Sequence, residues 1–184
     1  MTLVHRQEAV LAIVDIQERL LGALAEDRRT AVVERALIAV DTALVLGVPV
    51  LVSEQYPKGL GPTAAPIRER LGDQFAPVEK LAFSCGRSPE FRQALERTGR
   101  REVILCGVET HVCVLQTALD LQRDGYRVLV AADAVASRRD FDRDTALALL
   151  RQAGVTIGTT EMFAFQMLEC AGTDEFKQIA KIVR

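Results

Sequence analysis

The chain has 184 residues, of which 49% are hydrophobic and 26% are charged, and its formal net charge is -2. This length and composition are typical of one globular domain with a sizeable core, so we expect a single domain over residues 1–184. Lys and Arg form no basic block, and no apolar run approaches the length that spans a membrane. We therefore expect no nucleic-acid partner and no membrane partner.

The cysteines indicate a reducing compartment. Cys85, Cys106, Cys113 and Cys170 have neither a metal-binding nor a disulfide spacing. Residues 1–8 carry charge and lack the apolar segment of a signal peptide. These features predict a cytoplasmic location.

Apolar segments alternate with amphipathic helical patterns along the chain. The first half predicts a strand at 9–14, helices at 18–25 and 30–46, a strand at 49–53, a loop at 54–66, a short helix at 65–71 and a weaker strand at 76–80. The second half predicts a helix at 89–96, a strand at 102–106, a helix at 111–123, a strand at 127–131, a helix at 142–152, a strand at 155–158 and two short helices within 160–183. Glycines follow three of these helices, as is common after a helix end.

This alternation predicts an α/β fold, because strands that alternate with helices form a parallel sheet covered on both faces. We expect a three-layer α/β/α sandwich with a mainly parallel, Rossmann-like sheet of about six strands. Active sites in such folds lie at the carboxyl ends of the strands. Polar residues at these positions are therefore candidates for the site.

The segment 103–114 places a cysteine just beyond a buried strand. An apolar run ends at Gly107, and Cys113 follows in the first turn of a helical pattern. Backbone N–H groups and the positive end of the helix dipole favour a thiolate there and can receive a negative oxygen. Cys113 is thus a candidate nucleophile, although a small buried side chain remains the alternative. Cys106, inside the apolar run, is expected to be buried and inert.

Two charged residues share the expected sheet edge with Cys113. Asp15 ends the first strand and Lys80 ends the weaker one. The alternatives are a helix N-cap for Asp15, and a solvated side chain or a purely structural ion pair for Lys80. A Cys–His pair is not expected, because His5 lies in the polar N-terminus and His111 is two positions from Cys113, where helical side chains do not face each other. We therefore expect Asp15 to take the thiol proton, with Lys80 holding both groups by its charge.

Three segments together identify a family. Asp15 in VDIQ, Lys80 in EKLAFS and Cys113 in GVETHVC resemble the triad of the isochorismatase-like cysteine hydrolases. The resemblance implies a three-layer α/β sandwich, a general base at Asp15, electrostatic support from Lys80 and a nucleophile at Cys113. It also implies a cis peptide between Val108 and Glu109, an oxyanion hole formed by the N–H groups of Glu109 and Cys113, and a homo-oligomer.

Residues 54–61 are most similar to the subgroup of isochorismatase domain-containing proteins. The nicotinamidase branch of the family has Asp and His metal ligands after the second strand, whereas residues 53–61 contain neither. We therefore expect no metal and no cofactor. True isochorismatases lack the nucleophilic cysteine, so vinyl-ether hydrolysis of isochorismate is the less favoured chemistry for a chain that has Cys113.

The expected function is hydrolysis of a small amide or related acyl compound through a thioester on Cys113. Gln17, Tyr56 and Phe83 are the expected substrate pocket. Alternatively, Gln17 binds only backbone groups and Phe83 belongs to the core. A different class of function also stays open, in which the chain is a catalytically silent member that binds a small metabolite or serves oligomer assembly.

Overall fold

A six-stranded parallel sheet forms the centre of the computed structural model, which describes residues 3–183. Residues 1, 2 and 184, which the single-domain prediction includes, lie outside the described residues. The strand order is β3-β2-β1-β4-β5-β6. The strands are β1 (Ala9–Val14), β2 (Val50–Gln55), β3 (Pro77–Lys80), β4 (Glu102–Val108), β5 (Arg127–Ala136) and β6 (Thr156–Gly158).

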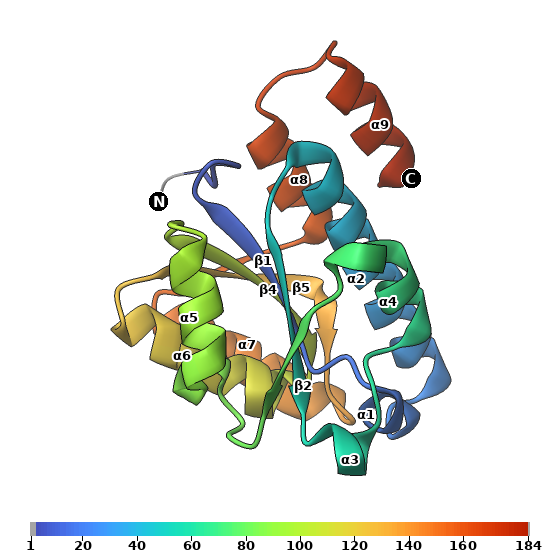
Figure 1. The fold of residues 1–184 in the computed structure, drawn as a ribbon, viewed down its shortest axis with the longest axis vertical. Coiled ribbons are helices and arrows are strands. Elements are labelled where there is room, and N and C mark those ends of the chain that lie inside the picture. The colour runs from blue at the N-terminus through green and yellow to red at the C-terminus, as the bar shows by residue number, and fades with distance from the viewer. Residues whose placement is uncertain (1–2, 184) are drawn as a thin grey trace.

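Helices cover both faces of this sheet (Figure 1). One face carries α2 (Glu26–Leu46), α4 (Ala65–Leu71), α8 (Thr160–Leu168) and α9 (Asp174–Ile182), and the other carries α5 (Pro89–Arg97), α6 (Leu115–Arg123) and α7 (Asp140–Gln152). Shorter elements are α1 (Glu18–Gly22), α3 (Pro57–Leu60), the 3₁₀ turns Gly72–Gln74 and Cys85–Arg87, and the π-helical turn Thr110–Val114. The predicted three-layer α/β fold is confirmed.

The local sequence explains the central elements. Every residue of β1 is apolar and buried, as expected for an inner strand of a parallel sheet. The N-terminus of α5 has Pro89 in its first turn, and the Ser88 side chain accepts a hydrogen bond from the Phe91 N–H. Gly47 ends α2 with a left-handed φ of 65°, which glycine adopts without steric cost.

The core consists of two apolar clusters, one on each face of the sheet. The α2 face buries Ile13, Ile104 and Cys106, among others, and the opposite face buries Val14, Leu105 and Cys113. Alternate residues of β1 and β4 thus supply opposite faces, as strand geometry requires. Among the described residues, no helix is both long and apolar enough to cross a membrane.

Several elements differ from their expected bounds at the carboxyl edge. Strand β2 continues to Gln55 and β5 to Ala136, whereas the sequence predicted ends at residues 53 and 131. The polar residues after Ser53 suggested a loop, but Glu54 and Gln55 are buried and hydrogen-bonded. The helix expected at 111–123 begins instead with the π-helical turn. These extensions bring polar side chains into the sheet edge.

Gly107 allows β4 to lie close to β1 at this edge. Its φ is 150°, and a Cβ at this position would collide with the carbonyl oxygen of Val14. Because β1 and β4 pair with Val14 opposite Gly107, the close approach holds the end of β4 beside Asp15. The glycine therefore sets the distance between the two strands that lead to Asp15 and Cys113.

Candidate active site

Asp15 and Lys80 form a buried ion pair at the carboxyl edge of the sheet. The Lys80 Nζ lies 2.6 Å from the Asp15 Oδ2, and the two side chains are 1% and 0% exposed. Lys80 is the last residue of β3, and Asp15 follows the end of β1 with a left-handed φ of 52°. The desolvation of two such charges needs further hydrogen bonds as compensation. Both residues have them.

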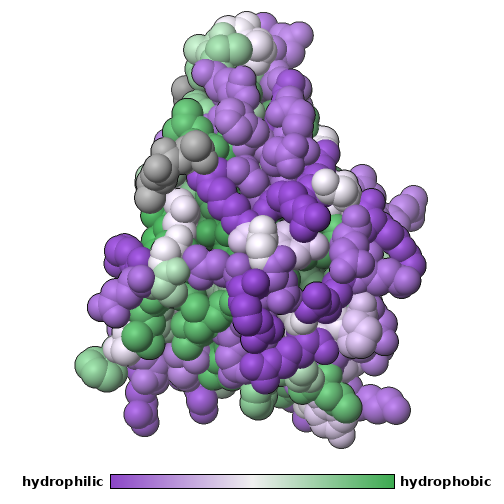
Figure 2. Space-filling model, turned by 90° about the vertical axis from the view of Figure 1, so that its left-hand side faces the viewer, coloured by the Kyte–Doolittle hydropathy of each residue, from purple (hydrophilic) through white to green (hydrophobic). Residues whose placement is uncertain are grey.

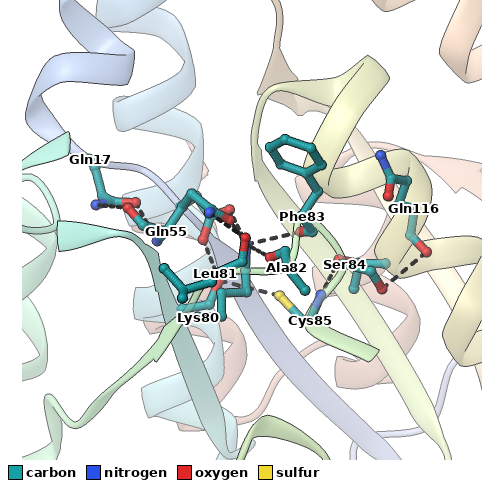
Figure 3. A network of polar contacts seen from close by, with 12 residues as sticks. Gln17, Gln55, Lys80, Leu81, Ala82, Phe83, Ser84, Cys85 and Gln116 are labelled. Carbon is teal, nitrogen blue, oxygen red and sulfur yellow. Dashed lines mark hydrogen bonds and ion pairs between the residues drawn. The ribbon is translucent and has the colours of Figure 1, made fainter. Parts of the chain in front are cut away.

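The Lys80 ammonium group has three further acceptors (Figure 3). Its Nζ donates to Gln55 Oε1 at 2.9 Å and to the carbonyl oxygens of Phe83 at 2.9 Å and Ala82 at 3.3 Å. The Gln55 side chain also binds the loop itself, since its Nε2 donates to the carbonyl oxygen of Leu81 at 2.8 Å. These contacts fix the end of the Lys80 side chain and anchor the loop after β3.

The second oxygen of Asp15 binds a serine. The Ser53 Oγ donates to Asp15 Oδ1 at 2.7 Å and accepts from the Cys85 Sγ at 3.3 Å. The Cys85 backbone N–H donates to Thr117 Oγ1 at 2.9 Å, which fixes the start of the 3₁₀ turn against α6. The Asp15 carboxylate therefore has a cation on one oxygen and a hydroxyl on the other.

Cys113 lies in the π-helical turn after β4 and is 5% exposed. Burial raises the pKa of its thiol, and the negative charge of Asp15 and hydrogen bonding to that carboxylate raise it further, while Lys80 lowers it. Burial and Asp15 thus oppose the preference for a thiolate that is expected at a helix N-terminus. The site holds a protonated thiol next to a carboxylate that can accept its proton.

The turn before Cys113 is tied to the end of β5. The peptide between Val108 and Glu109 is cis. The Glu109 Oε1 accepts hydrogen bonds from the Arg138 backbone N–H at 3.1 Å and from its Nε at 2.9 Å. His111 Nδ1 lies 2.9 Å from Ser137 Oγ. These contacts fix the backbone that presents Cys113.

The three expected pocket residues lie in different surroundings. Gln17 is buried; its Nε2 donates to the carbonyl oxygens of Gln55 at 3.0 Å and Gly61 at 2.6 Å, and its Oε1 accepts from the Gln55 N–H at 2.7 Å. Tyr56 is 51% exposed, and Phe83 is 53% exposed with its ring turned away from the polar network (Figure 3). A pocket of about 340 Å³ is lined by Tyr56, Pro57, Lys58, Glu79, Lys80 and Leu81. Of the three, Tyr56 alone is among these lining residues, and all three roles stay predictions.

Sequence reasoning missed Ser53, Gln55 and Cys85 as members of the site. Ser53 is a single hydroxyl after the apolar run of β2, and a buried polar residue in such a strand signals a specific partner. Gln55 was placed in a loop because the strand was expected to end earlier. Cys85 gave no usable signal, because its place beside Ser53 depends on the loop that follows β3.

The Isochorismatase domain matches residues 9–162 of this chain. The chain belongs to the isochorismatase family. It is 38% identical over 180 residues to isochorismatase domain-containing protein 2A of Mus musculus, covering 97% of this chain and 84% of the relative. It is 40% identical over 182 residues to the secreted isochorismatase effector Isc1 of Phytophthora sojae, covering 96% of this chain and 84% of the relative. The resemblance seen in the sequence is confirmed.

Solved structures agree with this assignment. The MAR1 ribonuclease of Caenorhabditis elegans superposes with a TM-score of 0.91 at 32% identity, covering 99% of this chain and 92% of that chain. The YcaC gene product of Escherichia coli, described as an octameric hydrolase of unknown specificity, superposes with a TM-score of 0.90 at 22% identity, covering 99% of this chain and 89% of that one. The second likeness concerns the fold alone.

Proposed function

We propose that this member of the isochorismatase-like hydrolase family is a cysteine hydrolase that acts on a small amide or a related acyl compound. The observation that carries the proposal is the buried ion pair of Asp15 and Lys80 beside the Cys113 thiol. A carboxylate next to a protonated thiol can act as a general base, and a neighbouring ammonium group compensates its charge through the reaction. A purely structural ion pair does not need a thiol against it.

The proposed cycle has two proton transfers through Asp15. The Cys113 Sγ attacks the substrate carbonyl carbon as Asp15 takes the thiol proton, and the amine leaves with that proton. A water molecule then attacks the thioester while Asp15 takes a proton from the water and returns it to the Cys113 sulfur. Lys80 remains a charged ammonium group throughout, which keeps the pair neutral when Asp15 is ionised.

The oxyanion that forms during attack is assigned to the backbone N–H groups of Glu109 and Cys113. The first N–H groups of a helical turn have no carbonyl partner within the helix, so the Cys113 N–H suits this role. The contacts of Arg138 with the Glu109 carboxylate hold the neighbouring backbone in place. One such donor typically contributes about 3 kcal/mol to transition-state stabilisation.

The substrate is proposed to be a small molecule bound near Gln17, Tyr56 and Phe83, without a metal or a cofactor. Hydrolysis of a panel of small amides by the wild-type protein and by Cys113→Ala tests the proposal. We expect hydrolysis of at least one amide by the wild type and none by the variant. Equal hydrolysis by both proteins contradicts the role of Cys113.

The same panel separates the alternatives. Isochorismate and a short RNA are included, because the family name and the name of the Caenorhabditis elegans relative make them natural comparisons. No turnover of any compound, combined with alkylation of Cys113 as slow as that of Cys106, supports a catalytically silent member. We do not propose a nucleic-acid substrate, because a chain with a net charge of -2 does not attract the negative phosphate backbone.

We also propose a homo-oligomer and a cytoplasmic location. The YcaC relative is described as octameric, whereas the Phytophthora sojae relative is described as secreted. The face over α5 and α6 mixes hydrophobic and hydrophilic areas and does not by itself define an interface (Figure 2). Light scattering of the purified chain tests the oligomer, and fractionation of the source cells tests the location.

A further inference from the structure

Ser53 lies between the candidate base and a second buried thiol. Its Oγ donates to Asp15 Oδ1 and accepts from Cys85 Sγ, and all three residues are 0% exposed. A serine hydroxyl carries a single hydrogen. Because the Cys85 thiol supplies the hydrogen for its own contact, the hydrogen of Ser53 is free to bind Asp15.

Ser53 also holds the backbone at Asp15. In the register of β1 and β2 it lies opposite Val14, and its carbonyl oxygen accepts the Asp15 N–H at 3.2 Å. Asp15 has a φ of 52°, a left-handed conformation that is uncommon for a residue other than glycine. One residue of β2 thus contacts both the backbone and the side chain of Asp15 where the chain turns out of the sheet.

We propose that Ser53 is a positioning residue whose hydroxyl orients the Asp15 carboxylate toward Cys113. Lys80 from β3 holds the other carboxylate oxygen, so the two contacts together fix the plane of the group. Among the described residues, Cys113 in the π-helical turn and Cys85 in the 3₁₀ turn are titratable groups that also interact electrostatically with this carboxylate. The inference rests on the proposed function in assigning Asp15 as the base for Cys113.

Alkylation of Cys113 by iodoacetamide tests this role without a known substrate. The rate is followed by peptide mass between about pH 4 and pH 8, a range that covers carboxyl titration. If Asp15 assists the thiol, the wild-type rate rises with ionisation of the carboxylate and then reaches a plateau. In Ser53→Ala we expect a plateau about tenfold lower, because the carboxylate that takes the thiol proton loses the hydrogen bond that orients it.

Ser53→Thr and Ser53→Val form a matched pair, because their branched side chains have similar shapes and differ in the hydroxyl. We expect Thr to keep the wild-type plateau within about twofold and Val to reproduce the lowered plateau of Ala. The pair also tests the role of the hydroxyl if Ser53→Ala does not fold. A purely structural role would lower the melting temperature of the Val variant and leave the height of the plateau unchanged.

Two results overturn the inference, and they are distinguishable. If the wild-type plateau exists and Ser53→Val keeps its height, Ser53 does not act on Asp15 although the proposed function stands. If wild-type Cys113 shows no plateau and its rate rises tenfold per pH unit like that of an isolated thiol, the proposed base is wrong and the inference fails with it.

Discussion

Cys106 and Cys113 are two buried thiols on the same segment with different surroundings. Cys106 lies inside β4, and Cys113 lies in the turn just after it. Burial raises the pKa of both thiols, and a carboxylate raises each further, Asp133 for Cys106 and Asp15 for Cys113. Lys80 opposes the shift at Cys113, and hydrogen bonding to Asp15 adds to it, whereas neither effect acts on Cys106. These two effects distinguish the candidate nucleophile, since burial affects both thiols alike.

The largest expected difference between the two thiols is in activity. Cys113→Ala should lower kcat/KM on the best amide by a factor on the order of 10⁴ or more, because it removes the proposed nucleophile. Cys106→Ala should stay within about twofold of the wild type, because its side chain lies in the core on the α2 face of the sheet. Steady-state kinetics on both variants, with circular dichroism to verify folding, checks this. Equal losses in the two variants would contradict the assignment.

Asp15→Asn should slow the alkylation of Cys113 toward the rate expected for Cys106. The amide keeps the shape of the carboxylate but cannot take the thiol proton, and loss of the Asp15 charge acts in the opposite direction by lowering the pKa of the thiol. Because loss of the base outweighs loss of the charge, alkylation of Cys113 at neutral pH should fall by about 10²–10⁴-fold. The dependence of its rate on pH should also become a steady tenfold rise per unit, as for an unassisted thiol. Iodoacetamide labelling with peptide mass measurement follows both thiols at once.

Cys106 is the internal control for the Asp15→Asn experiment. Its labelling rate should be the same in the wild type and the variant if both proteins remain folded. A faster Cys106 would report loosening of the core, which is a risk because the variant leaves the Lys80 charge buried without its partner. An unchanged Cys113 rate in a folded variant would place the base elsewhere.

The sheet and the pairing of Asp15 with Lys80 could be predicted from the sequence for the same reason. Strands such as β1 are continuous apolar runs, and parallel strands end at one edge, so Asp15 and Lys80 could be placed together by counting strands. The prediction needed no knowledge of strand order. The GVETHVC segment gave the family, and with it the roles expected of Cys113 and Glu109.

The contacts around the triad were not accessible, because they depend on three-dimensional packing between distant segments. The Ser53 bond to Asp15 depends on the register of β1 and β2, which apolar patterning does not define to one residue. The acceptors of Lys80 include carbonyl oxygens of Ala82 and Phe83, which follow from the path of the loop rather than from side-chain type. The effect of burial on the pKa of Cys113 could not be read from the helix position, because it depends on the packing around the turn.

Cys85 is a third buried thiol, and its titration is expected to make the stability of the fold depend on pH. Burial, followed by the charge of Asp15, raises the pKa of its thiol to about 11. The folded protein therefore holds this proton more tightly than the unfolded chain, so the resulting stability is complete below about pH 9 and is lost as pH rises toward 11. The loss should be about 2–3 kcal/mol in the free energy of unfolding.

Urea unfolding between pH 8 and pH 11 measures this loss, with Cys85→Ala as the comparison. The raised pKa values of Cys106 and Cys113 act in the same direction, so the wild type and the variant should both lose stability at high pH. The variant should lose less stability than the wild type, and the difference is the amount that titration of Cys85 contributes. Parallel curves for the two proteins would show that the Cys85 thiol does not titrate in this window.

The smallest expected difference between the two thiols is in stability, where Cys106 is expected to contribute more than Cys113. Cys106→Ala should lower the free energy of unfolding by about 1–2 kcal/mol, because Cys106 is 0% exposed in the core and its removal leaves a cavity. Cys113→Ala should change it by less than about 0.5 kcal/mol, because residues at functional sites are commonly placed at some cost to stability. Urea unfolding at pH 7 compares the variants. Greater destabilisation by Cys113→Ala than by Cys106→Ala would mean that the Cys113 thiol stabilises the fold through Asp15. Greater destabilisation by Cys106→Ala would mean that Cys106 supports the core, whereas Cys113 is retained for the proposed chemistry.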